Sequence, residues 1–192
     1  KLHRKLNTTT IHVTHDQVEA MTMGERICIL HQGKLIQLGT PLDIYNNPVN
    51  TFVAGFLGSP PMNLFDTKIL VKNNYLNFQI SNNSISLPNK KFRSLIKYSE
   101  SEIVFGIRPE DLYIEKISKN MIDFEVYVLA VESLGSEAIL VANFGDGQEI
   151  YVKVDRNYQA AYKDKIRIYF DYNKIKFFDK DSTESIKISL TI

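Results

Sequence analysis

The sequence predicts a short α/β segment followed by a mainly β domain. Before residue 58, strand and helix patterns alternate, ending in a helical apolar stripe from Val49 to Leu57. Gly58-Ser59-Pro60-Pro61 is the strongest break in the chain. After it, short apolar stretches separated by turn residues are typical of a small antiparallel barrel or sandwich. We therefore expect one domain over residues 1–58 and another over 59–192.

Composition restricts the class of protein. The 192 residues contain 23 Lys and Arg against 22 Asp and Glu, a net charge of +1, which argues against a polybasic nucleic-acid arm. A hydrophobic share of 44% is ordinary for a folded protein. The longest apolar run is Val126–Val131, whereas a membrane span needs about 20 residues. Cys28 is the single cysteine, so the chain has no internal disulfide and suits a reducing compartment.

The elements expected before Gly58 are predicted by local signals. β-Branched residues predict a strand over Thr8–Thr14. Asp16 is a good N-cap, Glu19 completes a pattern like a capping box, and Gly24 can end the resulting helix. The other expected elements are a hairpin of strands Arg26–His31 and Lys34–Leu38 around Gln32-Gly33, a short helix from Thr40-Pro41 to Tyr45, and the stripe ending at Leu57.

Beyond the break, turn residues such as Asn73-Asn74 and Gly145-Asp146-Gly147 separate candidate strands. A single helical patch is expected at Asn89–Tyr98. The strands are expected at Leu64–Lys72, Tyr75–Ile80, Ser84–Leu87, Ile103–Ile107, Phe124–Leu134, Glu137–Phe144, Gln148–Val154, Lys165–Tyr169 and Lys174–Phe178.

The N-terminus indicates part of a longer protein. The chain begins without an initiator Met or the apolar segment of a signal peptide. Leu2 and Leu6 are four residues apart, as on one face of the last turns of a helix.

His15 is the foremost candidate for chemistry. It stands where the first predicted strand meets a predicted helix N-terminus, whose unpaired N–H groups suit phosphate. A histidine there can hydrogen-bond a phosphate oxygen or orient an attacking water. The alternative is a structural histidine at a strand end.

The residues around His15 are similar to the switch-histidine segment of ABC-transporter ATPases. The rest of the chain resembles, in order, the ATPase subunits of carbohydrate importers of the maltose and glycerol-phosphate type, including the C-terminal regulatory barrel of their transport-associated OB (TOBE) domain. The residues that carry the resemblance are Val13–Thr22, Arg26-Ile27, Gly33-Lys34, Gly39-Thr40-Pro41, Ile44-Tyr45, Pro48, Phe52–Asn63, Phe105–Leu112 and Glu132–Glu137.

This resemblance implies a function and a site. Residues 1–58 would be the end of the nucleotide-binding domain, and 59–192 an OB-type regulatory domain. His15 would contact the γ-phosphate of ATP and help to organise hydrolysis, whereas Asp16 is read as a helix cap rather than a metal ligand. The intact subunit would use ATP and Mg²⁺. The sequence shows no phosphate loop, signature motif or acidic metal-binding strand, so we expect this chain alone to be inactive.

The same resemblance implies partners: a second copy of the subunit and transmembrane permease subunits, at the cytoplasmic face of the cell membrane. No nucleic acid is expected. The transported cargo stays open between sugars, glycerol phosphate and a polyamine, because other subunits select the cargo. A stand-alone OB-type module that binds an oligonucleotide or a small anion is the alternative of a different class.

Other residues are weaker candidates. His3 is expected to be exposed, His12 to lie in a core or interface and His31 at a strand end, and no metal site is predicted. Cys28, between two isoleucines, is expected to be buried. Arg108-Pro109-Glu110-Asp111 is read as a strand-ending turn or as a charge-pairing contact. The aromatic residues of Lys163–Lys180 are read as core rather than as a nucleic-acid surface.

Overall fold

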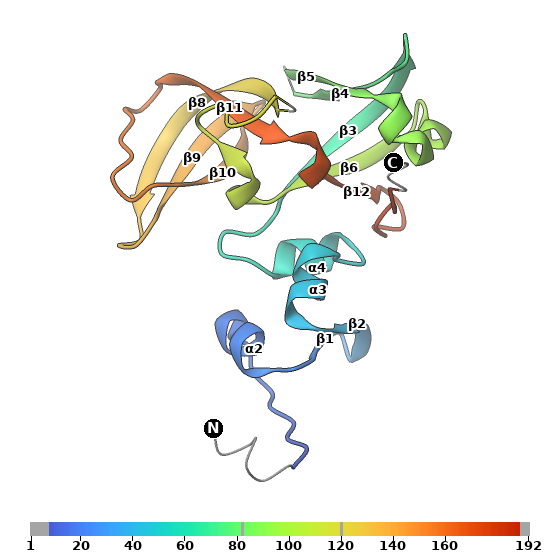
Figure 1. The fold of residues 1–192 in the computed structure, drawn as a ribbon, viewed down its shortest axis with the longest axis vertical. Helices are drawn as coiled ribbons and strands as arrows, with labels where there is room; N and C mark the ends of the chain where they lie inside the picture. Colours follow the sequence, from blue (N-terminus) through green and yellow to red (C-terminus); the bar gives the residue numbers. More distant parts are fainter. Residues whose placement is uncertain (1–7, 82, 120, 189–192) are drawn as a thin grey trace. The chain divides into compact units, whose positions relative to one another are not determined.

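A computed structural model describes residues 8–81, 83–119 and 121–188 (Figure 1). The chain divides into two compact units, Lys1–Asn47 and Pro48–Ile192, which we call the N-terminal unit and the β unit. The expected remnant of a helix at Lys1–Leu6, with His3, lies outside the described residues.

The N-terminal unit contains two short helices and one hairpin. Helix α2 spans Gln17–Met23 and helix α3 spans Pro41–Asn46, with Thr40 as its N-cap and Pro41 in its first turn. Strands β1 (Ile27–His31) and β2 (Lys34–Gly39) pair antiparallel. Gln32 and Gly33 both have positive φ, as a tight hairpin turn requires, and the hairpin prediction is confirmed.

Two predictions for this unit are wrong, and a third is wrong in part. Thr8–Thr14 forms no regular secondary structure, because no strand among the described residues pairs with it and a single strand cannot satisfy its own backbone. His12 is exposed, so its expected place in a core is wrong, whereas its place in an interface stays a prediction. Cys28 is exposed as well, because alternate residues of β1 face opposite sides and only the side of Ile27 and Ile29 is buried.

The β unit begins with helix α4 (Thr51–Phe56) and continues almost entirely in strands. The expected helical patch appears as 3-10 turns at Asn89–Lys91 and Arg93–Tyr98, with further 3-10 turns at Pro109–Asp111 and Tyr172–Lys174. The strands are β3 (Asn63–Lys72), β4 (Tyr75–Ile80), β5 (Asn83–Pro88), β6 (Glu102–Ile107), β7 (Leu112–Tyr113), β8 (Met121–Ser133), β9 (Ala138–Gly145), β10 (Gln148–Val154), β11 (Lys165–Asp171) and β12 (Lys176–Asp179).

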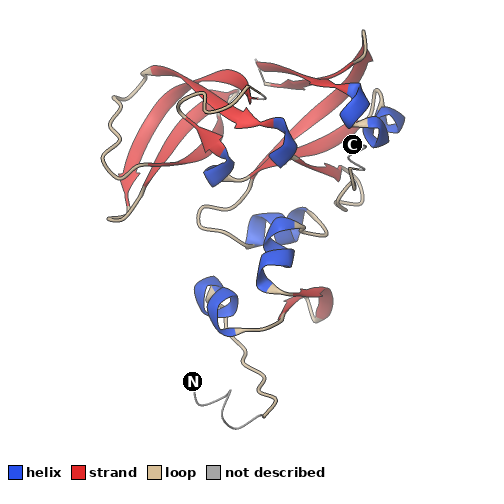
Figure 2. Ribbon diagram, in the orientation of Figure 1, coloured by secondary structure: helices blue, strands red, loops and turns tan. Residues whose placement is uncertain are grey.

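Within the described residues, these strands form two five-stranded sheets, with strand orders β12-β6-β3-β4-β5 and β10-β9-β8-β11-β7 (Figure 2). Every pairing in them is antiparallel. The mainly β class expected for this part of the chain is therefore confirmed. The two-residue strand β7 was not expected, because two residues give no periodicity.

The core of the β unit lies between the two sheets and is rich in phenylalanine. Phe105 of β6 contacts Phe78 and Phe177 of its own sheet, with ring centroids 6.2 and 5.7 Å away. Its ring also meets Phe170 of β11, in the other sheet, edge-on at 6.0 Å. Phe177 is fully buried, so the reading of the Lys163–Lys180 aromatics as core is confirmed for it.

Helix α4 packs on the outside of the first sheet. Its Ala54 is fully buried against Met62, Val104 and Phe178. Gly106 of β6 allows this close packing, since a Cβ there would come within 2.8 Å of the Met62 sulfur. The units therefore divide at Asn47, before α4, whereas the sequence places the boundary after this helix, at Gly58.

Arg108, which follows β6, also binds α4. It is 5% exposed, and its Nη1 donates to the backbone oxygen of Ala54 at 3.2 Å and to that of Leu57. These carbonyls belong to the C-terminal turn of the helix, where cations are favoured. The charge-pairing reading of the Arg108–Asp111 motif missed this contact, whereas the reading as a strand-ending turn agrees with the 3-10 turn at Pro109–Asp111.

Asn63 at the start of β3 joins this sheet to the edge of the other. Its side-chain Nδ2 donates to the backbone oxygen of Tyr151 in β10 at 2.9 Å. The backbone nitrogen of Tyr151 donates to Asn63 Oδ1 at 2.8 Å. One amide side chain thus pairs with both backbone groups of an edge residue, as a neighbouring strand would.

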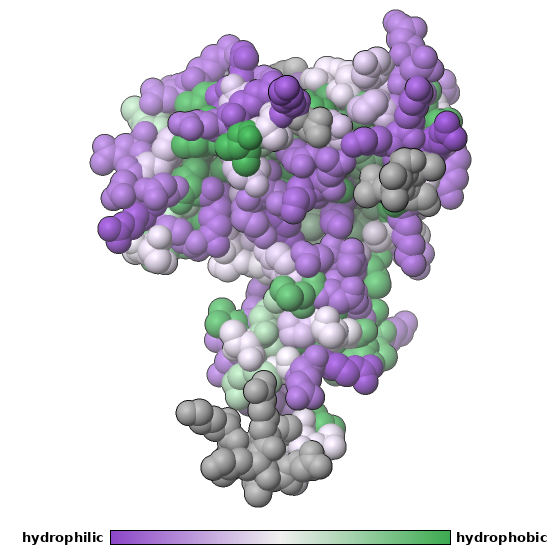
Figure 3. All heavy atoms as spheres, in the orientation of Figure 1, coloured by the Kyte–Doolittle hydropathy of each residue, from purple (hydrophilic) through white to green (hydrophobic). Residues whose placement is uncertain are grey.

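The surfaces of the units differ in the apolar groups they expose. The visible face of the β unit is mainly hydrophilic in Figure 3. Large apolar side chains that are more than half exposed are more frequent in the shorter N-terminal unit, namely Ile11, Val13, Val18, Met23, Leu30, Leu35 and Leu42, than in the β unit, where they are Ile117, Tyr127, Leu134 and Tyr162. No helix of the described residues is long and apolar enough to span a membrane.

The packing of α4 predicts that a chain from Pro48 is more stable than one from Ser59. The shorter chain leaves Arg108 without its carbonyl acceptors, and hydrogen bonds to charged groups contribute about 1.5–3 kcal/mol each. We expect its Tm, measured by circular dichroism, to be at least about 5 °C lower. Equal Tm values would show that α4 does not stabilise the sheet.

The Asn63 contact predicts that Asn63→Ala lowers the free energy of unfolding by about 1–3 kcal/mol, because two backbone groups of Tyr151 lose their partner. Urea unfolding followed by fluorescence measures this change. Asn157→Ala, at an exposed loop position, is the matched control and should stay within about 0.5 kcal/mol. A loss as small for Asn63 as for Asn157 would contradict the pairing.

Candidate functional site

His15 lies in the turn that leads into helix α2, and it is exposed. The following residue, Asp16, is the N-cap: its Oδ1 accepts hydrogen bonds from the backbone nitrogens of Val18 at 2.7 Å and Glu19 at 3.1 Å. The prediction of Asp16 as a helix cap is thus confirmed. His15 therefore directly precedes the start of a helix that the side chain of Asp16 fixes.

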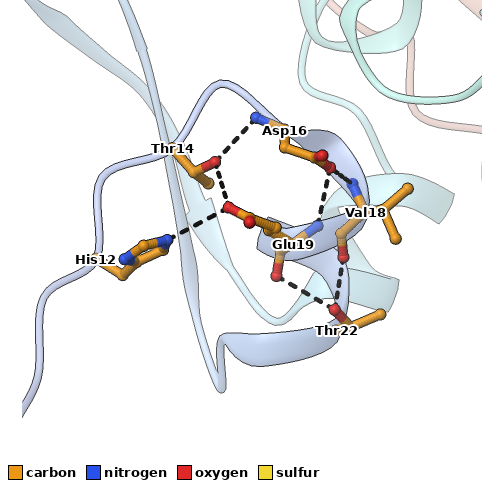
Figure 4. A network of polar contacts seen from close by, with 6 residues as sticks. All are labelled: His12, Thr14, Asp16, Val18, Glu19 and Thr22. Atoms are coloured by element: carbon orange, nitrogen blue, oxygen red, sulfur yellow. Dashed lines mark hydrogen bonds and ion pairs between the residues drawn. The ribbon is translucent and has the colours of Figure 1, made fainter.

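Glu19 does not complete the capping box that the sequence predicts. Instead of turning to the backbone of Asp16, its Oε2 accepts a hydrogen bond from Thr14 Oγ1 at 2.7 Å and lies 3.4 Å from His12 Nε2 (Figure 4). The same Thr14 hydroxyl accepts from the backbone nitrogen of Asp16 at 2.9 Å. Thr14 thus takes the place of the Glu19 side chain at the Asp16 backbone.

These contacts lower the pKa of Glu19 below its ordinary value of 4.5. The hydrogen bond from Thr14 is the largest cause and that from His12 the next, since both favour the ionised carboxylate. A carboxylate with a lowered pKa contributes its stabilisation above the ordinary pKa and loses it as the pH falls through the lowered value.

A second cluster of charged side chains lies around Asp111, in the β unit. Asp111 Oδ1 lies 3.6 Å from Lys174 Nζ. Burial raises the pKa of Asp111, an effect that Lys174 opposes, and burial lowers the pKa of Lys176. The motif that sequence reasoning singled out is therefore bound to other parts of the β unit, through Arg108 to α4 and through Asp111 to Lys174.

The described residues contain no group of three or more His, Cys, Asp or Glu side chains that could hold a metal ion. His12 and His31, the other described histidines, are both exposed, and His31 ends strand β1 as expected.

Sequence reasoning singled out His15 and the Arg108–Asp111 motif, but it did not predict the contacts made by the side chains of Thr14, Asn63 and Arg108. Thr14 could have been suspected, because a threonine at the N-terminus of a helix is a common cap. Asn63 and Arg108 bind backbone groups 88 and 51 to 54 residues away in the chain, and no local pattern reports such contacts.

The MalK OB fold domain matches residues 58–112 of the chain. The oligosaccharides import ATP-binding protein MsmX of Bacillus subtilis is 38% identical over 97% of this chain and 51% of its own length. The trehalose/maltose import ATP-binding protein MalK of Thermococcus litoralis is 41% identical over 97% of the chain and 50% of its own length. The osmoprotective compounds uptake ATP-binding protein GgtA of Synechocystis is 35% identical, with shares of 97% and 51%.

The two-sheet fold and the matched segment define the class, a protein with an OB-type domain of the kind found in MalK. Nearly the whole chain is also similar to ATP-binding subunits of ABC importers. It spans about half the length of these curated relatives. The resemblance identified from the sequence is confirmed.

The geometry around Glu19 predicts how its carboxyl titrates. Thr14→Val removes the hydroxyl donor, so the pKa of Glu19 should rise toward 4.5, as followed by carbon-13 NMR of the carboxyl group. Thr22→Val is the matched control: the Thr22 hydroxyl donates to the backbone oxygens of Val18 and Glu19 and not to the Glu19 carboxylate, so its loss should leave the pKa of Glu19 unchanged. An identical Glu19 titration in Thr14→Val and the parent would contradict the contact.

Proposed function

We propose that this chain is the C-terminal part of the ATP-hydrolysing subunit of an ABC importer, for sugars or glycerol phosphate. Similarity to ATP-binding import proteins over 97% of the chain supports the proposal. The order of motifs supports it too, from the segment around His15 to the OB-type domain.

The observation that carries the proposal is the placement of His15. This residue is exposed, and the turn that bears it is held by the bonds of Thr14 and Asp16. An exposed imidazole can donate an N–H to a phosphate oxygen or accept a proton from a water. In the intact subunit, His15 would contact the terminal phosphate of ATP and orient the water that attacks it.

The remaining parts of an ATP site are not supplied by the described residues. They form no cluster that could hold a metal ion, so we assign no magnesium ligand to this chain. Bound Mg²⁺ would neutralise charge on the phosphates of ATP. The contribution of this chain would be the imidazole of His15 and the turn that orients it.

The proposal extends to partners and location. Two copies of the subunit would close around ATP at the cytoplasmic face of the cell membrane, bound to transmembrane permease subunits. The β unit would then act as a regulatory contact surface, since a coupling between sites of about 1–3 kcal/mol changes the affinity of one site for its ligand by about 5–150-fold.

A stand-alone OB-type module for an oligonucleotide or small anion is not favoured, because the relatives resemble the chain on both sides of the OB-type domain. The names of the relatives do not agree on one transported cargo, because the name of GgtA refers to osmoprotective compounds rather than to a sugar. An affinity for single-stranded oligonucleotide that falls steeply with salt would favour the module instead.

The proposal predicts that His15→Ala in the intact subunit lowers the rate of ATP hydrolysis by about 100-fold or more, the range for loss of a group acting on the reacting atoms. ATP binding, measured by equilibrium dialysis with a labelled nucleotide, should change little. His31→Ala, at an exposed position on the β1–β2 hairpin, is the control and should hydrolyse ATP like the parent. Parental turnover in His15→Ala would remove His15 from the mechanism.

A further inference from the structure

The polar network beside His15 connects the residues on both of its sides to one carboxylate. Thr14 precedes His15 and donates to Glu19 Oε2. Asp16 comes directly after His15, and its backbone nitrogen donates to the Thr14 hydroxyl. Figure 4 shows the side chains of His12 and Thr14 directed toward Glu19, on the first turn of α2.

We infer that Glu19 and Thr14 are positioning residues for His15, with the Glu19 carboxylate holding the Thr14 hydroxyl and the hydroxyl holding the backbone of Asp16. The inference rests on the proposed function and deepens it, since it assigns the groups that set the direction of the imidazole. Neither residue would touch the nucleotide.

The hydrogen bonds of Thr14 and Asp16 fix the two neighbours of His15 separately. A hydroxyl that donates to a carboxylate and accepts from an amide has both of its directions fixed, so the Thr14 side chain holds a single rotamer. The bonds of Asp16 Oδ1 to Val18 and Glu19 fix the other side of the turn. The Cα of His15 therefore lies between two anchored residues, and its exposed ring has only its own side-chain torsions left to vary.

His12 provides a weaker second anchor. Its Nε2 lies 3.4 Å from Glu19 Oε2, and both side chains are about half exposed, at 55% and 49%. Solvent screens such a pair, so its contribution is small beside the 2.7 Å bond of Thr14. We therefore test the inference with variants of Thr14 and Glu19.

The test compares steady-state ATP hydrolysis by variants of the intact subunit. Thr14→Val keeps the shape of the side chain and removes the hydroxyl, so kcat should fall by about tenfold while KM for ATP stays within about twofold. Thr14→Ser restores the hydroxyl and should recover most of kcat. Glu19→Gln should lower kcat as Thr14→Val does, and the double variant should lose no more than either single one, because both act through the same contact.

A second measurement on the 192-residue chain needs no activity. Hydrogen exchange of the Asp16 amide, followed by NMR, should be faster by about tenfold in Thr14→Val, because the amide loses its acceptor. Thr22→Val, which removes a hydroxyl from the same helix without touching this contact, should leave both kcat and the Asp16 exchange rate unchanged.

The outcomes separate this inference from the proposed function. Parental kcat in Thr14→Val or Glu19→Gln, with His15→Ala inactive, would overturn the positioning inference alone. Parental kcat in His15→Ala would overturn the proposed function and the inference with it. A loss of kcat in Thr14→Ser as large as in Thr14→Val would also overturn the inference, because the hydroxyl would then not be the group that positions His15.

Discussion

Phe105 is the residue around which the β unit is organised, because its ring contacts phenylalanines of both five-stranded sheets. A twisted antiparallel sheet with one apolar face must cover that face, and here each sheet covers the other. Neighbouring phenylalanines extend the contact: Phe124 of β8 and Phe65 of β3 both pack on Phe144, at 4.4 and 4.9 Å. Edge-to-face aromatic pairs of this kind fix the relative position of the sheets as well as burying area.

Around this core, side chains that bond to backbone join the neighbouring elements. Arg108 serves the last carbonyls of α4, and Asn63 serves both backbone groups of Tyr151. Both side chains are buried, at 5% exposure each, so their bonds form away from competing water. The polar network of His12, Thr14, Asp16 and Glu19 differs, because it is exposed and relies on short-range geometry.

The sequence predicted the strands of the β unit closely, because alternating apolar residues between turn signals report a sheet with one buried face. Strand β4 has the predicted bounds, and β8 was expected from Phe124 but begins at Met121. The prediction failed where structure depends on distant partners. Thr8–Thr14 has the composition of a strand but pairs with none of the described strands, and Cys28 lies on the uncovered side of a two-stranded hairpin. His15 could be singled out as a candidate because its motif is local, whereas Arg108 acts through carbonyls more than fifty residues away.

The Asn63 side chain also covers part of an outer edge of the second sheet. Strand β10 is an outer strand, paired on one side with β9, and outer strands present free amides and carbonyls on which another chain can assemble. At Tyr151 those groups are already taken by Asn63, so an approaching strand finds the ladder interrupted midway along β10. A single amide therefore occupies the hydrogen-bonding groups of this edge residue, without a proline or an extra strand.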